Sequence, residues 1–207
     1  MSSYPTTLVR RGLQLSYATL AYNCLEGLIA ILAGLAAGSI ALVGFGADSL
    51  IEVTASLTAI WRLRSDSDAG HRERSERISL RIIGILFLAL AAYVAADATQ
   101  SLLTRQEPDA SLVGLVLAAA SLVVMPLLAN AKRRVALAMG SGALAAESRQ
   151  TMLCTYLSAI LLVGLILNAT LGWWWADPIA ALVMVPIIAR EGIEALRGRA
   201  ACGDCCP

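Results

Sequence analysis

Six apolar stretches, each long enough to cross a lipid bilayer as an α-helix, make up most of this sequence. The hydrocarbon core of a bilayer is about 30 Å thick and needs roughly 20 helical residues. The chain of 207 residues is 58% hydrophobic and 15% charged, whereas soluble chains are about 25% charged. We therefore expect an all-α, multi-pass protein of the inner or plasma membrane, with six transmembrane helices in contact with the lipid bilayer. The predicted spans are residues 15–36, 40–61, 82–103, 111–129, 143–171 and 178–196.

Basic residues fall on one side of this six-helix arrangement. They precede the first span, fill the segment 62–81 and follow the fourth and sixth spans, and only Arg105 lies on the other side. Cytoplasmic loops are enriched in Lys and Arg, so both termini are expected to be cytoplasmic. The run of Lys132, Arg133 and Arg134 counts here as one of these cytoplasmic signals.

The chain divides accordingly into three parts. We expect residues 1–14 to form a cytoplasmic tail, residues 15–197 the six-helix transmembrane domain, and residues 198–207 a short cytoplasmic tail that contains cysteines. The formal net charge of +1 gives no electrostatic basis for binding nucleic acid.

Two acidic side chains lie four residues apart in the second predicted span. This spacing puts Asp48 and Glu52 on one helical face, about 6 Å apart between Cβ atoms. Ionisable residues inside a span are costly and are functional candidates by default. Two carboxylates this close repel each other unless a cation or a proton lies between them. The pair therefore predicts metal binding, proton carrying, or exchange of one for the other.

Further candidate ligands lie in the fifth and first spans. Glu147, Gln150 and Cys154 are spaced three and four residues apart, which puts them on one face of the fifth helix. A thiolate is a soft metal ligand, and a glutamine offers a carbonyl oxygen. Oxygen and sulfur donors from two helices can close a tetrahedral site for Zn²⁺ or a similar ion. Glu26, three residues after Asn23 in the first span, can add to the same polar interior.

Each of these residues also has an ordinary structural explanation. Polar groups in spanning helices often form hydrogen bonds between helices, and this applies to the candidates of the first, second and fifth spans. Glu147 can pair with Arg149 or Lys132 near the cytoplasmic end. Asp177, which precedes Pro178, is expected to be the N-cap of the sixth helix.

Three motifs resemble those of the cation diffusion facilitator family, also called the cation efflux family. Residues 38–52, GSIALVGFGADSLIE, resemble the family's second helix, which carries a D-S-x-x-D/E pattern. Residues 141–154, SGALAAESRQTMLC, resemble its fifth-helix pattern, S-x-A-L-x-A-D-x-x-H-x-x-x-D. Residues 172–179, GWWWADPI, match the G-x-x-x-x-D-P start of its sixth helix. The likeness covers about residues 15–197, with six helices in the same order.

The resemblance implies a proton-coupled exporter of divalent metal, usually Zn²⁺, that works as a homodimer by alternating access. The family's transport ligands are two acidic residues of the second helix and a His and an Asp of the fifth. They correspond here to Asp48, Glu52, Gln150 and Cys154. Gln150 thus replaces the His and Cys154 the Asp, and Glu147 or Glu26 can supply a missing ligand. The family's cytoplasmic metal-binding domain is not expected after the sixth span, as in the family's small membrane-only branch.

The sequence therefore predicts a divalent metal cation transporter, with Zn²⁺ as the first candidate, that exchanges metal for protons between the second and fifth helices. The alternative is a membrane sensor or regulator that binds metal without moving it. An enzyme is not expected, because the chain has no HExxH motif and its one histidine, His71, lies in a predicted loop. No tightly bound cofactor is expected. Cys202, Cys205 and Cys206 of the C-terminal tail can capture a soft metal on the cytoplasmic side.

Overall fold

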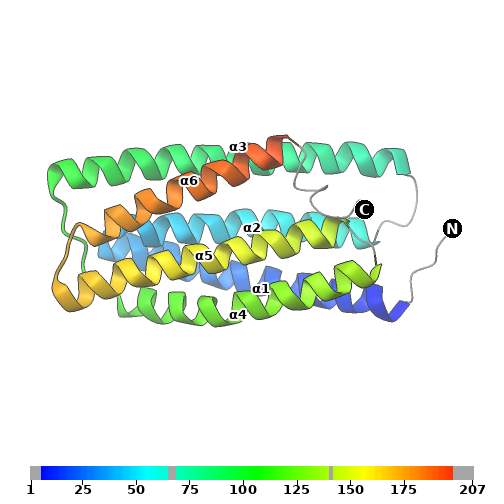
Figure 1. The fold of residues 1–207 in the computed structure, drawn as a ribbon, viewed down its shortest axis with the longest axis horizontal. Coiled ribbons are helices and arrows are strands. Elements are labelled where there is room, and N and C mark those ends of the chain that lie inside the picture. The colour runs from blue at the N-terminus through cyan, green and yellow to red at the C-terminus, as the bar shows by residue number, and fades with distance from the viewer. Residues whose placement is uncertain (1–5, 65–68, 140–141, 198–207) are drawn as a thin grey trace.

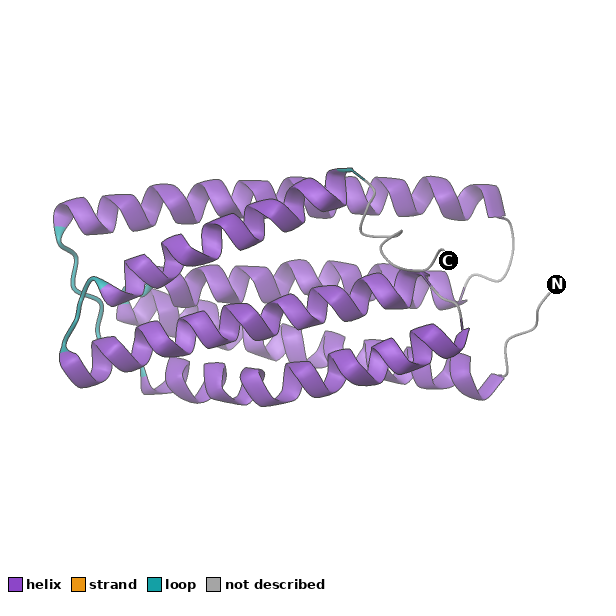
Figure 2. Ribbon diagram, viewed as in Figure 1, coloured by secondary structure: helices purple, strands orange, loops and turns teal. Residues whose placement is uncertain are grey.

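Six long α-helices form the fold. The computed structural model describes residues 6–64, 69–139 and 142–197, and these residues contain no strand (Figure 1, Figure 2). The helices are α1 (Thr6–Ala37), α2 (Ile40–Arg64), α3 (Ala69–Thr104), α4 (Leu112–Met139), α5 (Gly142–Leu171) and α6 (Ala176–Leu196). They run up and down along one common direction, and the packing is most extensive within the pairs α1–α2, α4–α5 and α3–α6. The expected six-helix, all-α architecture is confirmed.

Helices α1 to α5 are long and apolar enough to cross a membrane. Their apolar stretches are Thr7–Ala37, Ile40–Trp61, Arg81–Thr104, Leu112–Met139 and Leu144–Leu171. Helix α6 has 21 residues and rises about 31 Å, but it carries Asp177 near its start and Arg190, Glu191 and Glu194 near its end. It therefore does not belong to this apolar set, although it packs along α3. The architecture is that of a multi-pass integral membrane protein.

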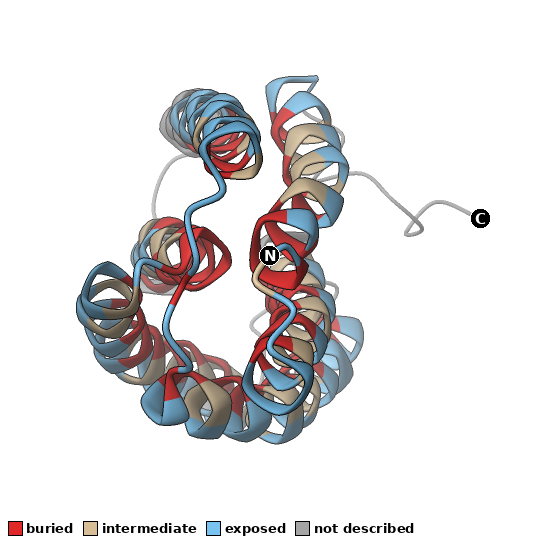
Figure 3. Ribbon diagram, turned by 90° about the vertical axis from the view of Figure 1, so that its left-hand side faces the viewer, coloured by how far each residue is buried: buried red, intermediate tan, exposed pale blue. Residues whose placement is uncertain are grey.

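The outer surface of the bundle is apolar. On α1, the large side chains Leu25, Leu28, Leu32 and Leu35 are each more than half exposed. Figure 3 shows the same division along the helix axes, with buried residues facing inward and exposed residues facing outward. An apolar surface of this extent is rare on soluble proteins, and in a bilayer it faces the lipid chains.

The pairing of α3 with α6 depends on two glycines. A Cβ atom on Gly84 would lie 2.8 Å from the carbonyl oxygen of Gly192, and a Cβ atom on Gly192 would lie 3.0 Å from the carbonyl oxygen of Gly84. Helices α1 and α2 approach as closely at Gly27, where an added Cβ atom would lie 3.0 Å from the carbonyl oxygen of Gly46. Small residues of this kind let spanning helices pack backbone to backbone.

Asp177 caps α2 and not its own helix. Its Oδ2 accepts hydrogen bonds from the backbone N–H groups of Ile40, over 3.0 Å, and Ala41, over 3.4 Å, and Ser39 Oγ donates to its Oδ1. Trp175, at the N-cap of α6, makes no side-chain capping bond. The expectation that Asp177 caps the sixth helix is therefore wrong. The turn before α6 brings the carboxylate against the start of α2, where unpaired N–H groups and the positive end of the helix dipole favour an anion.

Three helices extend well beyond the predicted spans. Helix α1 begins at Thr6 instead of residue 15, so residues 6–14 are helical. Helix α4 continues to Met139, well past the predicted end at residue 129, and α3 begins at Ala69 instead of residue 82. Each extension carries basic residues, at which the predicted spans end, but a helix can continue past the charges that mark the edge of its apolar part. As a result, Lys132 lies inside α4 and His71 lies in α3, not in a loop.

Candidate metal site

Polar side chains gather in the interior where α1, α2, α4 and α5 face one another. The buried members are Asn23 and Glu26 of α1, Asp48, Ser49, Glu52 and Ser56 of α2, Ser121 and Lys132 of α4, and Glu147, Thr151 and Cys154 of α5. Polar groups in such an environment need compensating contacts. Two groups can be distinguished by their contacts. We call Glu26, Asp48 and Glu52 the carboxylate cluster, and Lys132, Glu147 and Thr151 the Lys132 network.

Helix α2 turns Asp48 and Glu52 into the interior, in agreement with their four-residue spacing. Asp48 is 5% exposed and Glu52 is 1% exposed. The charged groups that act on Asp48 are Glu52, Glu26 and Glu191, all of them carboxylates. Glu52 Oε1 accepts a hydrogen bond from Thr151, whereas Glu52 Oε2 is buried and has no hydrogen-bond partner. Hydroxyl groups therefore satisfy this pair only in part.

Helix α1 brings Glu26 and Asn23 to the same interior. Ser49 Oγ donates to Glu26 Oε2 over 2.9 Å, and Cys154 Sγ contacts the same oxygen at 3.8 Å. Glu26 Oε1 and both amide atoms of Asn23 are buried without a hydrogen-bond partner. Buried polar atoms without a partner are costly. Asn23 lies against Glu52, and Ser121 and Tyr22 lie against Glu26. The carboxylate oxygens of Glu26 and Glu52 that form no hydrogen bond of normal length therefore lie in a polar setting that can accommodate a ligand.

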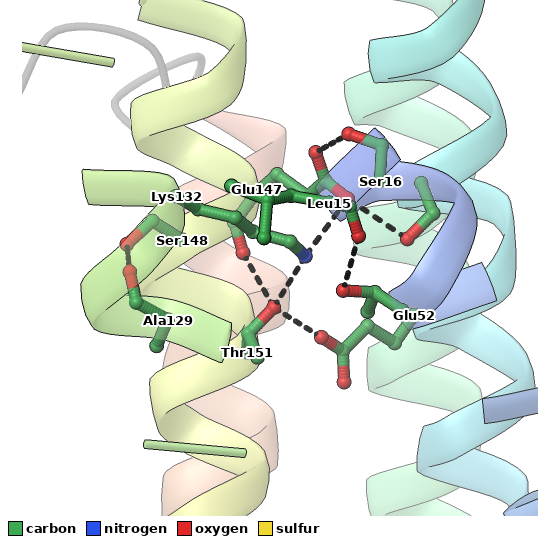
Figure 4. A network of polar contacts seen from close by, with 10 residues as sticks. Leu15, Ser16, Glu52, Ala129, Lys132, Glu147, Ser148 and Thr151 are labelled. Atoms are coloured by element: carbon green, nitrogen blue, oxygen red, sulfur yellow. Dashed lines mark hydrogen bonds and ion pairs between the residues drawn. The ribbon is translucent and has the colours of Figure 1, made fainter. Parts of the chain in front are cut away.

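Lys132 of α4 forms a buried ion pair with Glu147 of α5 (Figure 4). The distance from Lys132 Nζ to Glu147 Oε1 is 2.9 Å, and neither side chain is more than 1% exposed. Ser56 donates to Glu147 Oε1 over 3.0 Å, and Ser16 donates to Glu147 Oε2 over 2.7 Å. Glu147 is thus held by a lysine and two serines, as in the ordinary structural explanation of this residue.

Thr151 joins this ion pair to the carboxylate cluster. Lys132 Nζ donates to Thr151 Oγ1 over 2.9 Å, and the same hydroxyl lies 2.5 Å from Glu52 Oε1 (Figure 4). It also lies 3.0 Å from the carbonyl oxygen of Glu147. Because a hydroxyl has one proton to donate, it can serve only one of these two acceptors at a time. Thr151 therefore links the Lys132 ammonium to Glu52.

The two fifth-helix candidates differ in their positions. Cys154 is fully buried and contacts Glu26. Gln150 is only partly buried, and its Nε2 atom has no hydrogen-bond partner. The α5 side chain that contacts Glu52 is Thr151, the residue next to Gln150.

The predicted ligands do not form a closed metal site. In the part of the chain whose side chains the structure describes, no three His, Cys, Asp or Glu residues are close enough to hold one metal ion. Glu147 is engaged by Lys132, and the remaining acidic candidates surround the interior from α1 and α2. The tail cysteines Cys202, Cys205 and Cys206 lie outside the described residues.

Sequence reasoning missed Lys132 and Thr151 as interior residues. Lys132 was counted among the charges that set the orientation, but it lies on the buried face of α4 together with Ser121, Met125 and Ala129. The spacing of three and four residues along that face is the signal that would have found it, given the true length of the helix. No comparable signal distinguishes Thr151 from Gln150.

The charge balance of the interior favours a cation. Lys132 is balanced by Glu147. Among the described side chains, Glu26, Asp48 and Glu52 form no ion pair of their own. Carboxylates inside a membrane need a cation or a proton to be stable there. The cluster is therefore a candidate binding place for metal ions or protons.

Comparisons with known proteins point to one family. Residues 16–199 match the cation efflux transmembrane domain. The chain is also 26% identical over 167 residues to an uncharacterized transporter of Synechocystis sp., an alignment that covers 77% of this chain and 54% of the relative. The chain thus spans about half the length of that curated relative. Because the domain match takes in all six helices and agrees with the three motifs, the chain belongs to the cation efflux family.

Proposed function

We propose that this chain transports divalent metal cations across the membrane in exchange for protons, with Zn²⁺ as the first candidate. The family to which it belongs transports metal cations. The observation that carries the proposal is the carboxylate cluster, Glu26, Asp48 and Glu52, which is buried in the bundle and forms no ion pair among the described side chains. Charges of this kind inside a membrane mark ion and proton pathways.

The donor atoms suggest how the cargo is held. Asp48 and Glu52 offer carboxylate oxygens from α2. Glu52 Oε2 and Glu26 Oε1 form no hydrogen bond, so no hydrogen bond has to break when either oxygen binds a metal ion. Cys154 adds a soft donor from α5, beside Glu26. A mixed oxygen and sulfur set suits Zn²⁺ and related ions. Protons that replace the metal at the same carboxylates keep the interior neutral, which couples the two fluxes.

The ligands come from three helices, and this links binding to conformational change. Glu26 lies on α1, Asp48 and Glu52 on α2, and Cys154 on α5. A metal ion can be fully coordinated only when these helices approach one another, so it stabilises the state in which they do. Alternating access then follows from helix movements that open one side at a time. The family resemblance favours a homodimer and export from the cytoplasm, and the basic residues favour an orientation with both termini in the cytoplasm.

A metal-binding regulator is the second candidate. Gln150 stands where the family has a histidine, and its Nε2 atom forms no hydrogen bond. A chain with an incomplete ligand set on α5 can bind metal without completing a transport cycle. In that case, binding is observed and flux is not.

The deciding experiment measures Zn²⁺ flux in proteoliposomes under a pH gradient. We expect wild-type protein to move Zn²⁺ when the gradient is applied, and Asp48→Asn to lose most of this flux, because it removes a charge that the metal and the proton share. Asp97→Asn is the matched control, since Asp97 lies on α3, outside the carboxylate cluster. Zn²⁺ binding is measured on the same preparations.

Three outcomes separate the candidates. Gradient-driven flux that Asp48→Asn abolishes and Asp97→Asn retains supports the transporter. Binding without flux in the wild type supports the regulator. Absence of both binding and flux with Zn²⁺, Co²⁺ and Cd²⁺ contradicts both functions.

A further inference from the structure

Lys132 is the only buried basic side chain among those that the structure describes. Its ammonium group carries three N–H donors, and Glu147 Oε1 and Thr151 Oγ1 accept from it, each over 2.9 Å. A positive charge inside a cation transporter requires explanation, because it repels the cargo. Its position relative to Glu52 supplies one.

The ion pair lies about one helical turn from Glu52. Glu147 accepts a hydrogen bond from Ser56, which follows Glu52 by four residues on α2, a rise of about 6 Å. Thr151 spans the interval, with the Lys132 ammonium on one side of its hydroxyl and Glu52 Oε1 on the other. The charge of Lys132 also acts directly on Glu52. A lysine side chain is long and flexible, so its ammonium can exchange one nearby carboxylate for another.

We propose that Lys132 is a built-in cation that competes with the transported metal for Glu52, and that Glu147 decides this competition by holding the ammonium. The inference rests on the proposed function, because it takes Glu52 as a metal ligand. While Glu147 binds the ammonium, the Thr151 hydroxyl contacts Glu52 Oε1, and Oε2, which forms no hydrogen bond and is approached by the neutral amide of Asn23, is available to the metal. When Glu147 carries no charge, the ammonium of Lys132 has Glu52 as its nearest remaining carboxylate partner, because Thr151 already contacts both groups. Lys132 then occupies the carboxylate that the metal would bind.

A purely structural ion pair makes a different prediction. Buried ion pairs contribute little net stability, and replacing both partners by neutral residues is often neutral or stabilising. If the pair only held α4 against α5, its joint removal would leave metal affinity unchanged. If Lys132 competes with metal, removing Glu147 alone and removing both partners shift the affinity in opposite directions.

The test compares the Zn²⁺ affinity of purified protein in lipid nanodiscs at one fixed pH. For Glu147→Gln, we expect about tenfold weaker binding, because the ammonium moves to Glu52. For Lys132→Met combined with Glu147→Gln, we expect binding about fivefold tighter than in the wild type, because the competitor is gone. The matched control is Arg190→Met combined with Glu194→Gln, which removes an exposed ion pair of the same 2.9 Å length on α6. It should bind Zn²⁺ like the wild type.

Each result decides the inference. Opposite shifts in the two variants support it, and equal affinities or shifts in the same direction overturn it while leaving metal transport in place. If Glu147→Gln does not fold, the double variant decides alone: tighter binding supports the inference, and unchanged or weaker binding overturns it. A wild type that binds neither Zn²⁺ nor Cd²⁺ contradicts the proposed function, and this inference falls with it.

Discussion

A single buried thiol lies beside the carboxylate cluster. Cys154 is fully buried, and its Sγ lies 3.8 Å from Glu26 Oε2. Thiolates favour Cd²⁺ and Zn²⁺, whereas hydroxyl and carboxylate oxygens favour harder ions. At the scale of the residue, Cys154 is therefore the natural determinant of which divalent metal the site prefers.

Cys154→Ser should lower the affinity for Cd²⁺ relative to Co²⁺. We expect the ratio of the two affinities to fall about tenfold, equivalent to about 1.4 kcal/mol, because an oxygen replaces sulfur with little change in size. Competition binding with the two metals measures this ratio. Cys24→Ser is the control, since Cys24 is exposed on the outside of α1. An unchanged ratio in Cys154→Ser would exclude the thiol as a ligand.

The interior could be predicted from the sequence at some residues and not at others. The four-residue spacing of Asp48 and Glu52 correctly predicted that both face inward, because they lie on one helical face of a short apolar span. The rotation of α5 depends on contacts with α4, such as the hydrogen bond from Ser148 to the carbonyl oxygen of Ala129. A local pattern does not show such contacts, and for this reason Thr151 was missed.

At the scale of the element, α2 is completed by a residue of α6. Asp177 satisfies the first N–H groups of α2 together with the hydroxyl of Ser39. This bond joins segments that are more than 130 residues apart in the sequence. It therefore holds the first turn of α2, which follows the turn at residues 38–39, against the start of α6.

Asp177→Ala should destabilise the bundle by about 1 kcal/mol, the usual cost of removing a helix cap. Thermal unfolding in detergent measures the loss, and Asp177→Asn should recover part of it because its amide oxygen still accepts hydrogen bonds. Asp109→Ala is the control, since Asp109 is exposed in the loop that precedes α4. Equal unfolding temperatures for Asp177→Ala and the wild type would show that the cap contributes nothing.

Hydropathy predicted the number, order and approximate position of the helices, because each helix needs an apolar surface to lie in lipid. It did not predict the first turns of α1 and α3 or the last turns of α4, which carry charged residues. It also could not assign the partner of Asp177. A residue before a proline is the usual N-cap of its own helix, and only the packing of α6 on α2 changes that assignment.

At the scale of the whole molecule, six helices place the start of α1 and the end of α6 on the same side. The basic residues indicate that this side is cytoplasmic. Lys132 no longer counts toward this argument, because it is buried in an ion pair. Arg133 and Arg134 are exposed and still support it.

Thiol labelling in intact cells should show this orientation. In a chain whose native cysteines are replaced by serine, Glu107→Cys should react with a membrane-impermeant maleimide, because Glu107 lies in the exposed loop between α3 and α4. Arg197→Cys, at the end of α6, should react only after the membrane is permeabilised. The reverse pattern would invert the orientation, and the proposed direction of metal export would be inverted with it.

The capping bond between Asp177 and the start of α2 also defines a pivot for motion. Asp48 lies about 12 Å from this pivot and Arg64 about 36 Å, at about 1.5 Å per residue. A tilt of α2 by about 10° would shift the level of Asp48 by about 2 Å and the far end by about 6 Å. Because a metal–oxygen bond is only about 2 Å long, a shift of this size at Asp48 is enough to break coordination, so one tilt about this pivot would open the distant end of α2 and loosen the bound cation together.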